Sequence, residues 1–264
     1  MTTLLFLAHT ELEGSLAQPA LGALRAALDL DLPGATLVVG LFGETVQAAA
    51  NALAGCGAHR FLGVSGEDFG ESRYASDAAA AEALCRAANA DIVVAAGTSR
   101  CSRMLPGVAH RLGGRVDTHV TSISVGEGAP VVTRWFYRQR IQAVLQRSEK
   151  PWLILVGPGA HEPYRGEAGV AEVEEIAVSL PETSRRTRVT GIQAPPSDEQ
   201  TIRPDAPLLF VAGAGWTKKQ RDGQAHTDEA EALILDFLRR SRASLGSTKS
   251  LVEQTTEGQE VLPF

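Results

Sequence analysis

The chain opens with four short apolar runs, each typical of a strand that is buried on both faces of a parallel sheet. They span residues 4–8, 36–42, 60–64 and 92–96. Between these runs, apolar side chains recur at helical spacing over residues 18–30, 45–54 and 74–89, and we expect Asp77 and Glu82 on the solvated side of the last of these helices. Strands and helices that alternate in this way predict a doubly wound, mostly parallel α/β sheet of the Rossmann-like kind.

One strand–turn–helix unit lies between Asp91 and Gly114. Its apolar run ends at Gly97-Thr98-Ser99-Arg100, where small polar residues leave backbone N–H groups free. A helical pattern follows, and Gly113-Gly114 ends it. The carboxyl edge of an open α/β sheet is where ligands or partners usually bind. Thr98, Ser99 and Arg100 are therefore candidates for binding an anion.

After Gly114 the helical signals stop, and four alternating segments follow at residues 116–125, 131–137, 141–145 and 152–156. We expect these segments to be antiparallel strands or hairpins added to the sheet, with residues 172–180 as a further edge strand.

Aromatic rings and cations are mixed near residue 136. The run Arg134-Trp135-Phe136-Tyr137, with Arg138 and Arg140 after it, has the composition that is enriched in protein interfaces. A strand with one solvated face explains these residues almost as well.

The composition changes after residue 182. Residues 183–207 contain four arginines and four prolines, which is typical of a linker. A buried strand that runs into glycines begins at Leu208, a helical pattern covers residues 227–243, and a turn is expected at 245–249. We therefore predict an N-terminal α/β domain over residues 1–182, a linker over 183–207 and a partial C-terminal α/β domain over 208–264.

Charge and composition narrow the function classes. A net charge of −6 argues against bulk nucleic-acid binding, which needs a basic surface. No apolar run approaches about 20 residues, and no basic stretch precedes the first one, so neither a membrane span nor a signal peptide is expected. Three scattered cysteines, Cys56, Cys85 and Cys101, favour free thiols in a reducing cytoplasm and no zinc site.

Three stretches resemble the α subunit of electron transfer flavoproteins. The first, AAGTSRCSRMLPGVAHRLGGRVDTHVTSISV, is similar to the family's "GHTSRGRDLAPRLAARLG…TDV", with Gly97–Arg100 and Asp117 among the matches. The second, TRWFYRQRIQAVLQ, resembles an "R-x-x-Y-x-G-x-A" strand pair through Arg134 and Tyr137. The third joins RRTRVTGIQAPP…APLLFVAGAGW to a helix and SLGSTKSLVE. Their order and spacing match the family over nearly the whole chain.

The resemblance implies an N-terminal α/β domain that packs on a β subunit and a C-terminal domain that binds FAD. It also implies a carrier that passes electrons from dehydrogenases to a membrane-associated quinone reductase, rather than an enzyme with a substrate of its own. Because the family holds no flavin in its first domain, Thr98, Ser99 and Arg100 are better explained as helix-capping or partner-facing residues.

The sequence departs from the family where flavin would bind. Ala214 replaces an arginine of the glycine turn, and Lys249 replaces the arginine of the family's Gly-Ala-Ser-Arg, which here reads Gly246-Ser247-Thr248-Lys249. Lysine is a point charge without the planar fork of arginine. The family's later segments, "QTGK" and "SGAIQH", do not follow. We expect either a truncated or divergent flavin domain or a piece of a longer chain.

By this resemblance the cofactor-binding residues are Gly213, Gly215, Lys218, Gly246, Thr248 and Lys249. Gly213 and Gly215 after a buried strand are typical of a pyrophosphate cradle, although an ordinary strand-to-loop turn has the same residues. Lys218 can replace the missing charge or lie in a solvated basic loop. Lys249 can stabilise a reduced flavin or be a surface lysine.

No nucleophile–base or paired-carboxylate spacing is present, so no catalytic residue and no hydrolase chemistry are predicted. The first hypothesis is therefore an electron carrier that pairs with a β subunit. Two alternatives stay open: a flavin-free paralogue that serves as a structural partner, and a small adenine-nucleotide-binding α/β protein that acts alone.

Overall fold

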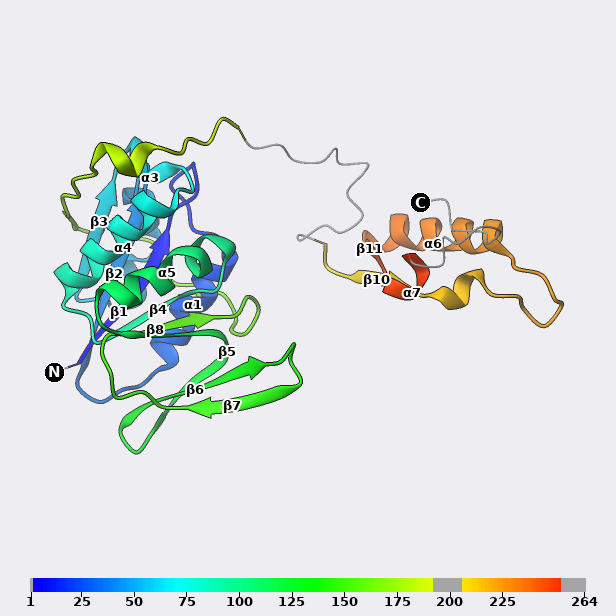
Figure 1. Cartoon of the computed structure of the whole chain (residues 1–264), viewed down its shortest axis with the longest axis horizontal. Coiled ribbons are helices and arrows are strands. Elements are labelled where there is room, and N and C mark those ends of the chain that lie inside the picture. The colour runs from blue at the N-terminus through cyan, green and yellow to red at the C-terminus, as the bar shows by residue number, and fades with distance from the viewer. Residues whose placement is uncertain (1, 192–205, 253–264) are drawn as a thin grey trace. The chain divides into compact units, whose positions relative to one another are not determined.

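A computed structural model of the chain describes residues 2–191 and 206–252. The chain divides into two compact units, residues 1–190 (unit 1) and residues 191–264 (unit 2), and each is described by itself (Figure 1).

Unit 1 is built on a nine-stranded sheet with the order β7-β6-β5-β8-β4-β1-β2-β3-β9 in the described part of the chain. The strands are β1 (Thr2–His9), β2 (Ala35–Gly43), β3 (Arg60–Ser65), β4 (Ile92–Ala96), β5 (Arg115–Gly126), β6 (Ala129–Phe136), β7 (Ile141–Leu145), β8 (Trp152–Val156) and β9 (Val173–Glu175). Only the β5–β6 and β6–β7 pairs are antiparallel; the other neighbouring pairs are parallel.

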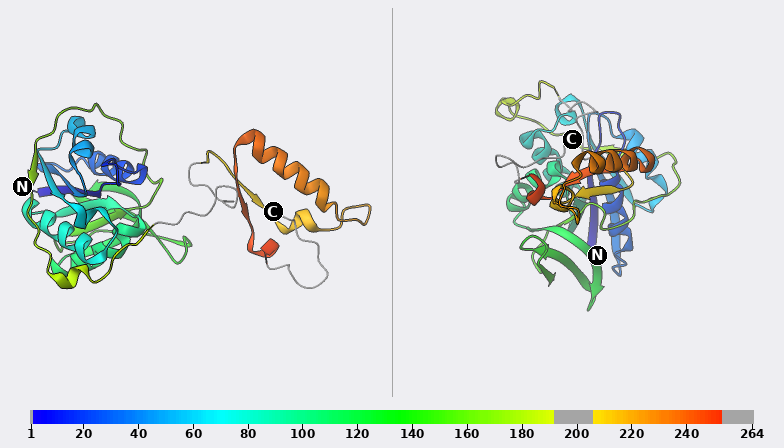
Figure 2. Two further views of the ribbon diagram at one scale, coloured as in Figure 1. Left: turned by 90° about the horizontal axis from the view of Figure 1, so that it is seen from above. Right: turned by 90° about the vertical axis from the view of Figure 1, so that its right-hand side faces the viewer.

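Helices cover both faces of this sheet (Figure 2). They are α1 (Gln18–Asp29), α2 (Gln47–Ala52), α3 (Glu67–Gly70), α4 (Tyr74–Ala88) and α5 (Ser99–Arg111), with the short 3₁₀ helices η1 (Ala54–Cys56) and η2 (Glu182–Arg185). Successive side chains of a strand point to opposite faces, so Phe6 of β1 packs with α1 while its neighbours Leu5 and Leu7 pack with α4 and α5. The predicted doubly wound α/β sheet with added antiparallel strands is confirmed.

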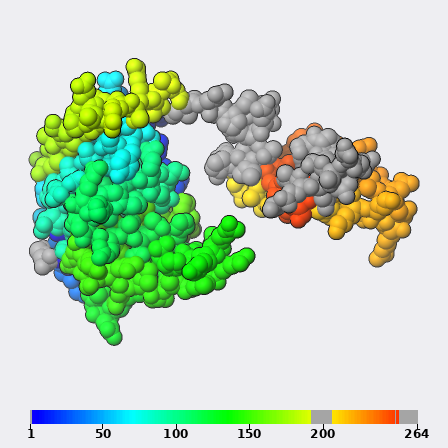
Figure 3. Space-filling model, in the orientation of Figure 1, coloured from blue at the N-terminus to red at the C-terminus, as the bar shows by residue number. Residues whose placement is uncertain are grey.

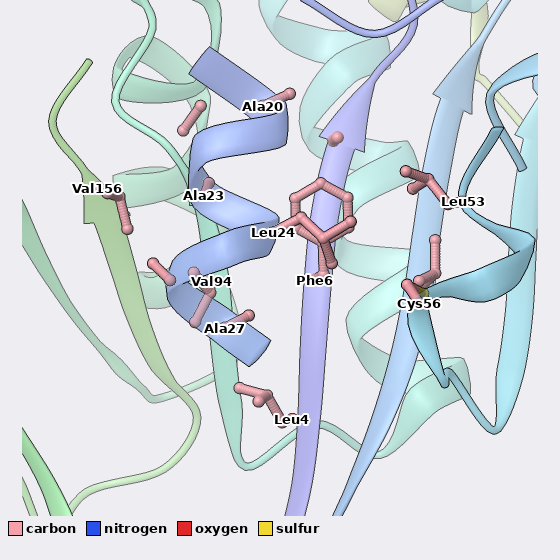
Figure 4. Close-up of a cluster of buried hydrophobic side chains, with 14 of the residues drawn as sticks. Leu4, Phe6, Ala20, Ala23, Leu24, Ala27, Leu53, Cys56, Val94 and Val156 are labelled. Atoms are coloured by element: carbon pink, nitrogen blue, oxygen red, sulfur yellow. The ribbon is translucent and has the colours of Figure 1, made fainter. Parts of the chain in front are cut away.

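The core between α1 and the sheet is filled by small residues on the helix and larger ones on the strands. Leu24 of α1 is fully buried and lies over Phe6 of β1, and Ala23 and Ala27 allow the helix to approach the sheet closely (Figure 4). The abundance of alanine in this chain therefore supports helix-on-sheet packing.

One strand prediction was wrong. Trp152–Val156 was expected among the antiparallel additions, but β8 lies inside the sheet, where it is parallel to both β4 and β5. The physical reason is burial: all five of its residues are buried, as an inner strand of a parallel sheet requires.

Unit 2 has its own small parallel sheet, formed by β10 (Leu209–Ala212) and β11 (Ser244–Ser247). The helices are α6 (Thr227–Ser241), the 3₁₀ helix η3 (Ala214–Thr217) and the short α7 (Lys249–Val252). Most of residues 245–249, expected as a turn, belong to β11, because Leu245 is opposite Phe210 and both pack against the core under α6.

Loss of core volume under α1 should destabilise unit 1. We expect Leu24→Ala to lower the free energy of unfolding by about 2–5 kcal/mol, because the fully buried side chain leaves a cavity. Leu12→Ala is the matched control, since Leu12 is 65% exposed, and it should change stability by less than about 0.5 kcal/mol. Denaturant unfolding of the two variants measures the difference; equal stabilities would contradict this assignment of the core.

Candidate functional site

The two predicted cofactor loops of unit 2 lie side by side. β10 and β11 are parallel, so the residues that follow them leave the same edge of the sheet. The backbone N–H of Thr248 donates a hydrogen bond of 2.9 Å to the carbonyl oxygen of Ala212. A Cβ atom at Gly213 would lie 3.9 Å from Cγ2 of Thr248. The structure thus brings Gly213 and Thr248, 35 positions apart in the sequence, into contact distance.

The turn after β10 presents backbone donors. The N–H groups of Ala214 and Gly215 donate to no group in the described part of the chain. A Cβ atom at Gly215 would meet nothing within 4 Å, so the backbone there is open to a ligand. An open turn with free N–H groups at the carboxyl edge of a parallel sheet is a suitable place for a phosphate group.

The other predicted residues lie on the elements that flank this turn. Lys218 follows η3, and its side chain is exposed. Gly246 lies inside β11, opposite Val211. Lys249 begins α7, directly after Thr248. These positions leave Gly213, Gly215, Lys218, Gly246, Thr248 and Lys249 as predictions for cofactor binding.

Trp216 is a residue of this loop that sequence reasoning did not single out. Its ring packs edge-on against Phe210, with 6.3 Å between ring centroids, and Phe210 packs in turn on Phe237 at 5.5 Å. This chain of rings fixes the turn to the core of unit 2. The feature of the sequence that could have identified Trp216 is its position, since it is an aromatic residue directly after the Gly-Ala-Gly turn.

In unit 1, Thr98 and Arg100 have structural roles. Thr98 caps α5, since its Oγ1 accepts a hydrogen bond of 3.3 Å from the N–H of Cys101. Arg100 forms a two-pronged pair with Asp77, with Nε–Oδ2 of 3.0 Å and Nη2–Oδ1 of 2.7 Å. Its guanidinium also donates to the carbonyls of Phe69 and Gly70. Arg100 is therefore fully engaged and provides no free anion site.

Asp77 corrects an expectation from the helical pattern. The sequence placed it on the solvated side of its helix, but its side chain is fully buried. Arg100 and Arg103 pair with it in the interior, and these contacts offset the cost of burying a carboxylate. Helical spacing predicts which face of a helix is buried, but it does not predict an ion-pair partner from another helix, such as Arg100 of α5.

A cavity of about 530 Å³ lies in unit 1 between the loop after β3 and residues 185–188. Two of the three arginines that line it are paired: Arg185 binds both oxygens of Asp68 at 2.6–3.1 Å, and Arg73 contacts the same carboxylate at 3.4 Å. The N–H of Val189 donates to Glu71 at 3.3 Å. These contacts hold residues 185–189, predicted as part of the linker, against the β3–α4 loop.

The hairpin of β6 and β7 is anchored by a single buried carboxylate. Asp117 of β5 is 1% exposed and accepts hydrogen bonds from the indole of Trp152 at 2.9 Å, from Arg147 at 2.9 and 3.0 Å and from Arg134 at 3.1 Å. Burial by itself would raise the pKa of Asp117, but the hydrogen bonds from Arg147, Trp152 and Arg134 outweigh burial and hold the pKa below its usual value.

The tip of this hairpin is the interface candidate from the sequence. Arg134 faces inward and lies 4.1 Å from the centroid of the Phe136 ring, whereas Tyr137 is 74% exposed. Tyr137, Arg138 and Gln139 have φ values of 48°, 56° and 64°. Each left-handed residue of this kind costs roughly 1–2 kcal/mol, so the conformation of the tip is strained.

Residues 2–191 and 206–252 contain neither a metal-binding cluster nor a membrane-spanning helix. No group of three or more His, Cys, Asp or Glu side chains in these residues is arranged to hold a metal ion. Among the helices of the same residues, none has both the length and the apolar character to cross a bilayer. The three cysteines are free thiols, and all are buried.

Comparison with known families gives one clear match. A family model described as the electron transfer flavoprotein domain matches residues 4–181, a span that begins inside β1 and ends after β9. A comparison with curated proteins found no match.

The pairing at Asp117 should make stability depend on pH. We expect Asp117→Asn to lower the free energy of unfolding by about 3 kcal/mol near neutral pH, because two arginines and an indole lose their shared carboxylate. Because the folded-state pKa is depressed, this stabilisation is present above the unfolded-state value of about 3.9 and is lost as the pH falls through the folded-state pKa.

Denaturant unfolding between neutral pH and about pH 3 checks this expectation. The difference in stability between wild type and Asp117→Asn should shrink on acidification, whereas Asp31→Asn, at an exposed position, should match the wild type throughout. A difference that does not change with pH would contradict the ionised pairing.

Proposed function

This chain belongs to the electron transfer flavoprotein family, and from that premise we propose that it is an α-subunit-like electron carrier. It pairs with a β subunit in the cytoplasm and contributes to an FAD site. It takes electrons from dehydrogenases and passes them to a quinone-linked acceptor. The chain needs no acid–base residues of its own, because FAD supplies the redox chemistry when it is bound.

The observation that carries the FAD proposal is the meeting of two loops at one sheet edge in unit 2. Gly213–Gly215 and Ser247–Lys249 follow parallel neighbouring strands, and Thr248 hydrogen-bonds to the end of β10. Ligands of open α/β sheets bind beyond the carboxyl ends of strands, which is where these loops lie.

The residues present fit the phosphate part of such a cofactor. The free N–H groups of Ala214 and Gly215 can donate to phosphate oxygens, and the empty space at Gly215 allows close approach. Thr248 lies next to Gly213 and carries a hydroxyl, a group that can donate a hydrogen bond to a phosphate. Lys218 offers a positive charge in the segment after the turn, where Ala214 lacks one. In the sequence, Lys249 keeps the charge of the family's arginine.

A second role, as a flavin-free structural partner, is favoured by one observation. Ala214 stands where the family has an arginine, and its methyl group can neither pair with a phosphate nor hydrogen-bond to a ring. In that role unit 1 would hold the partner and no redox group would be needed.

The colour of the complex separates the two roles. Co-expression with the β subunit should give a yellow heterodimer with flavin absorbance and about one FAD per pair. A colourless complex of correctly folded subunits would contradict the carrier role and support the flavin-free one. Absorbance after gel filtration, with flavin quantified after denaturation, is the measurement.

A methyl group at the open turn should weaken flavin binding. We expect Gly215→Ala to raise the dissociation constant for FAD by about tenfold or more, because the new Cβ occupies the space through which a phosphate approaches. Gly191→Ala is the matched control, since a Cβ there also meets nothing within 4 Å and should leave binding unchanged. Titration of the apo complex with FAD measures both, and an unaltered constant in Gly215→Ala would remove this turn from the site.

A further inference from the structure

The sheet of unit 1 ends in an edge strand that lacks the usual protection. β7 (Ile141–Leu145) contains no charged residue and no proline, and it is the last strand of the sheet. Ile141 is 52% exposed and Val144 is 68% exposed. Natural proteins usually protect such edges with charges, proline or short length, because an open apolar edge pairs with other strands.

The opposite edge of the same sheet shows that protection. β9 has three residues, and its Glu174 pairs with Arg60 at 2.7 Å. Its Glu175 accepts hydrogen bonds from the N–H and the hydroxyl of Ser65 at 3.0 and 2.8 Å. One edge is therefore short and charged, while the other is longer, uncharged and apolar.

The charge around β7 is opposite in sign to that of the chain. Residues 129–148 contain four arginines and no Asp or Glu, whereas the whole chain has a net charge of −6. Arg134 and Arg147 share the carboxylate of Asp117. Arg138 and Arg140 are exposed, and neither has an ion-pair partner among the residues that the structure describes.

The strained tip places these cations beside an exposed aromatic ring. Tyr137 stands in the left-handed region together with Arg138, and the hairpin projects from the body of unit 1 (Figures 1 and 3). Tyrosine and arginine are the residue types most often found at the energetic centres of protein interfaces.

We propose that β7 is the docking edge for a partner protein, which adds an extended strand with an apolar residue on each face, against Ile141 and Val144, and carboxylates opposite Arg138 and Arg140. The inference rests on the proposed pairing with a β subunit and names the surface for it. Main-chain hydrogen bonds give the register, Ile141 and Val144 give apolar contact, and the two arginines select an acidic partner.

Charge and burial favour this partner over two others. A second copy of the chain would bring another hairpin without acidic residues to the same edge, so the unpaired arginines would gain no carboxylate within that hairpin. A nucleic acid would neutralise Arg138 and Arg140 but would leave Ile141 and Val144 exposed to water.

Val144→Glu tests the edge directly. The variant removes an apolar contact and adds a charge that repels an acidic strand, so the affinity for the β subunit should fall by about tenfold or more. Val170→Glu is the matched control, because Val170 is 94% exposed and lies outside the hairpin. Affinity is measured by titration of immobilised wild type and variants with the β subunit, with circular dichroism as the check of folding.

Charge reversal at the tip provides a second test that does not alter β7. Arg138→Glu/Arg140→Glu should weaken binding by a similar factor and reduce its salt dependence, whereas Arg165→Glu, at another exposed arginine, should do neither. If Val144→Glu does not fold, the comparison of the double arginine variant with Arg165→Glu tests the docking edge by itself.

The outcomes separate this inference from the proposed function. Normal binding by folded Val144→Glu and by the tip variant would overturn the docking edge and leave the carrier role intact. If the wild-type complex with the β subunit is colourless and these variants still disrupt it, the docking edge is supported and the FAD role is overturned. Failure of the wild type to bind the β subunit would overturn both the pairing and the edge, and self-association lost in Val144→Glu would assign the edge to a second copy instead.

Discussion

The carboxylate of Asp117 joins the two parts of the unit 1 sheet. It binds Trp152 on a parallel inner strand, Arg134 on the hairpin and Arg147 just after it. A buried charge is costly unless its hydrogen bonds are satisfied, and here three side chains satisfy it. The hairpin is therefore held at a defined angle to the parallel core, which allows a strained tip and an open edge strand to be displayed without unfolding the sheet.

Unit 2 also has a parallel sheet, but its sheet has two strands and its hydrophobic core is much smaller in the described part of the chain. Its core among the described residues comprises four buried side chains, Ala212, Ala230, Ile234 and Leu251, so little apolar surface supports it. Parallel strands still bring the loops after β10 and β11 together, and any ligand that binds these loops stabilises the folded unit by mass action. In the role proposed for unit 2, cofactor binding would therefore add the stability that its small core does not supply.

Several features of the fold and site were predictable because they depend on local pattern. β4 was predicted over Ile92–Ala96 and is found there, since an apolar run between turn residues has few alternative structures. The place of Trp152–Val156 was not, because a five-residue apolar run carries no information about strand order. The partner of Asp77 was also missed, since Arg100 approaches it from another helix, 23 positions along the chain.

The sequence by itself determined the α/β class, the family and the two glycine- and threonine-containing loops of unit 2, because periodicity and motif order are properties of neighbouring residues. Only the tertiary structure decided that Gly213 and Thr248 are neighbours, that Arg100 pairs with a buried carboxylate and that β7 is an edge strand. Each of these depends on which distant strands and helices become neighbours, and that choice is made by packing of the whole chain rather than by any local pattern.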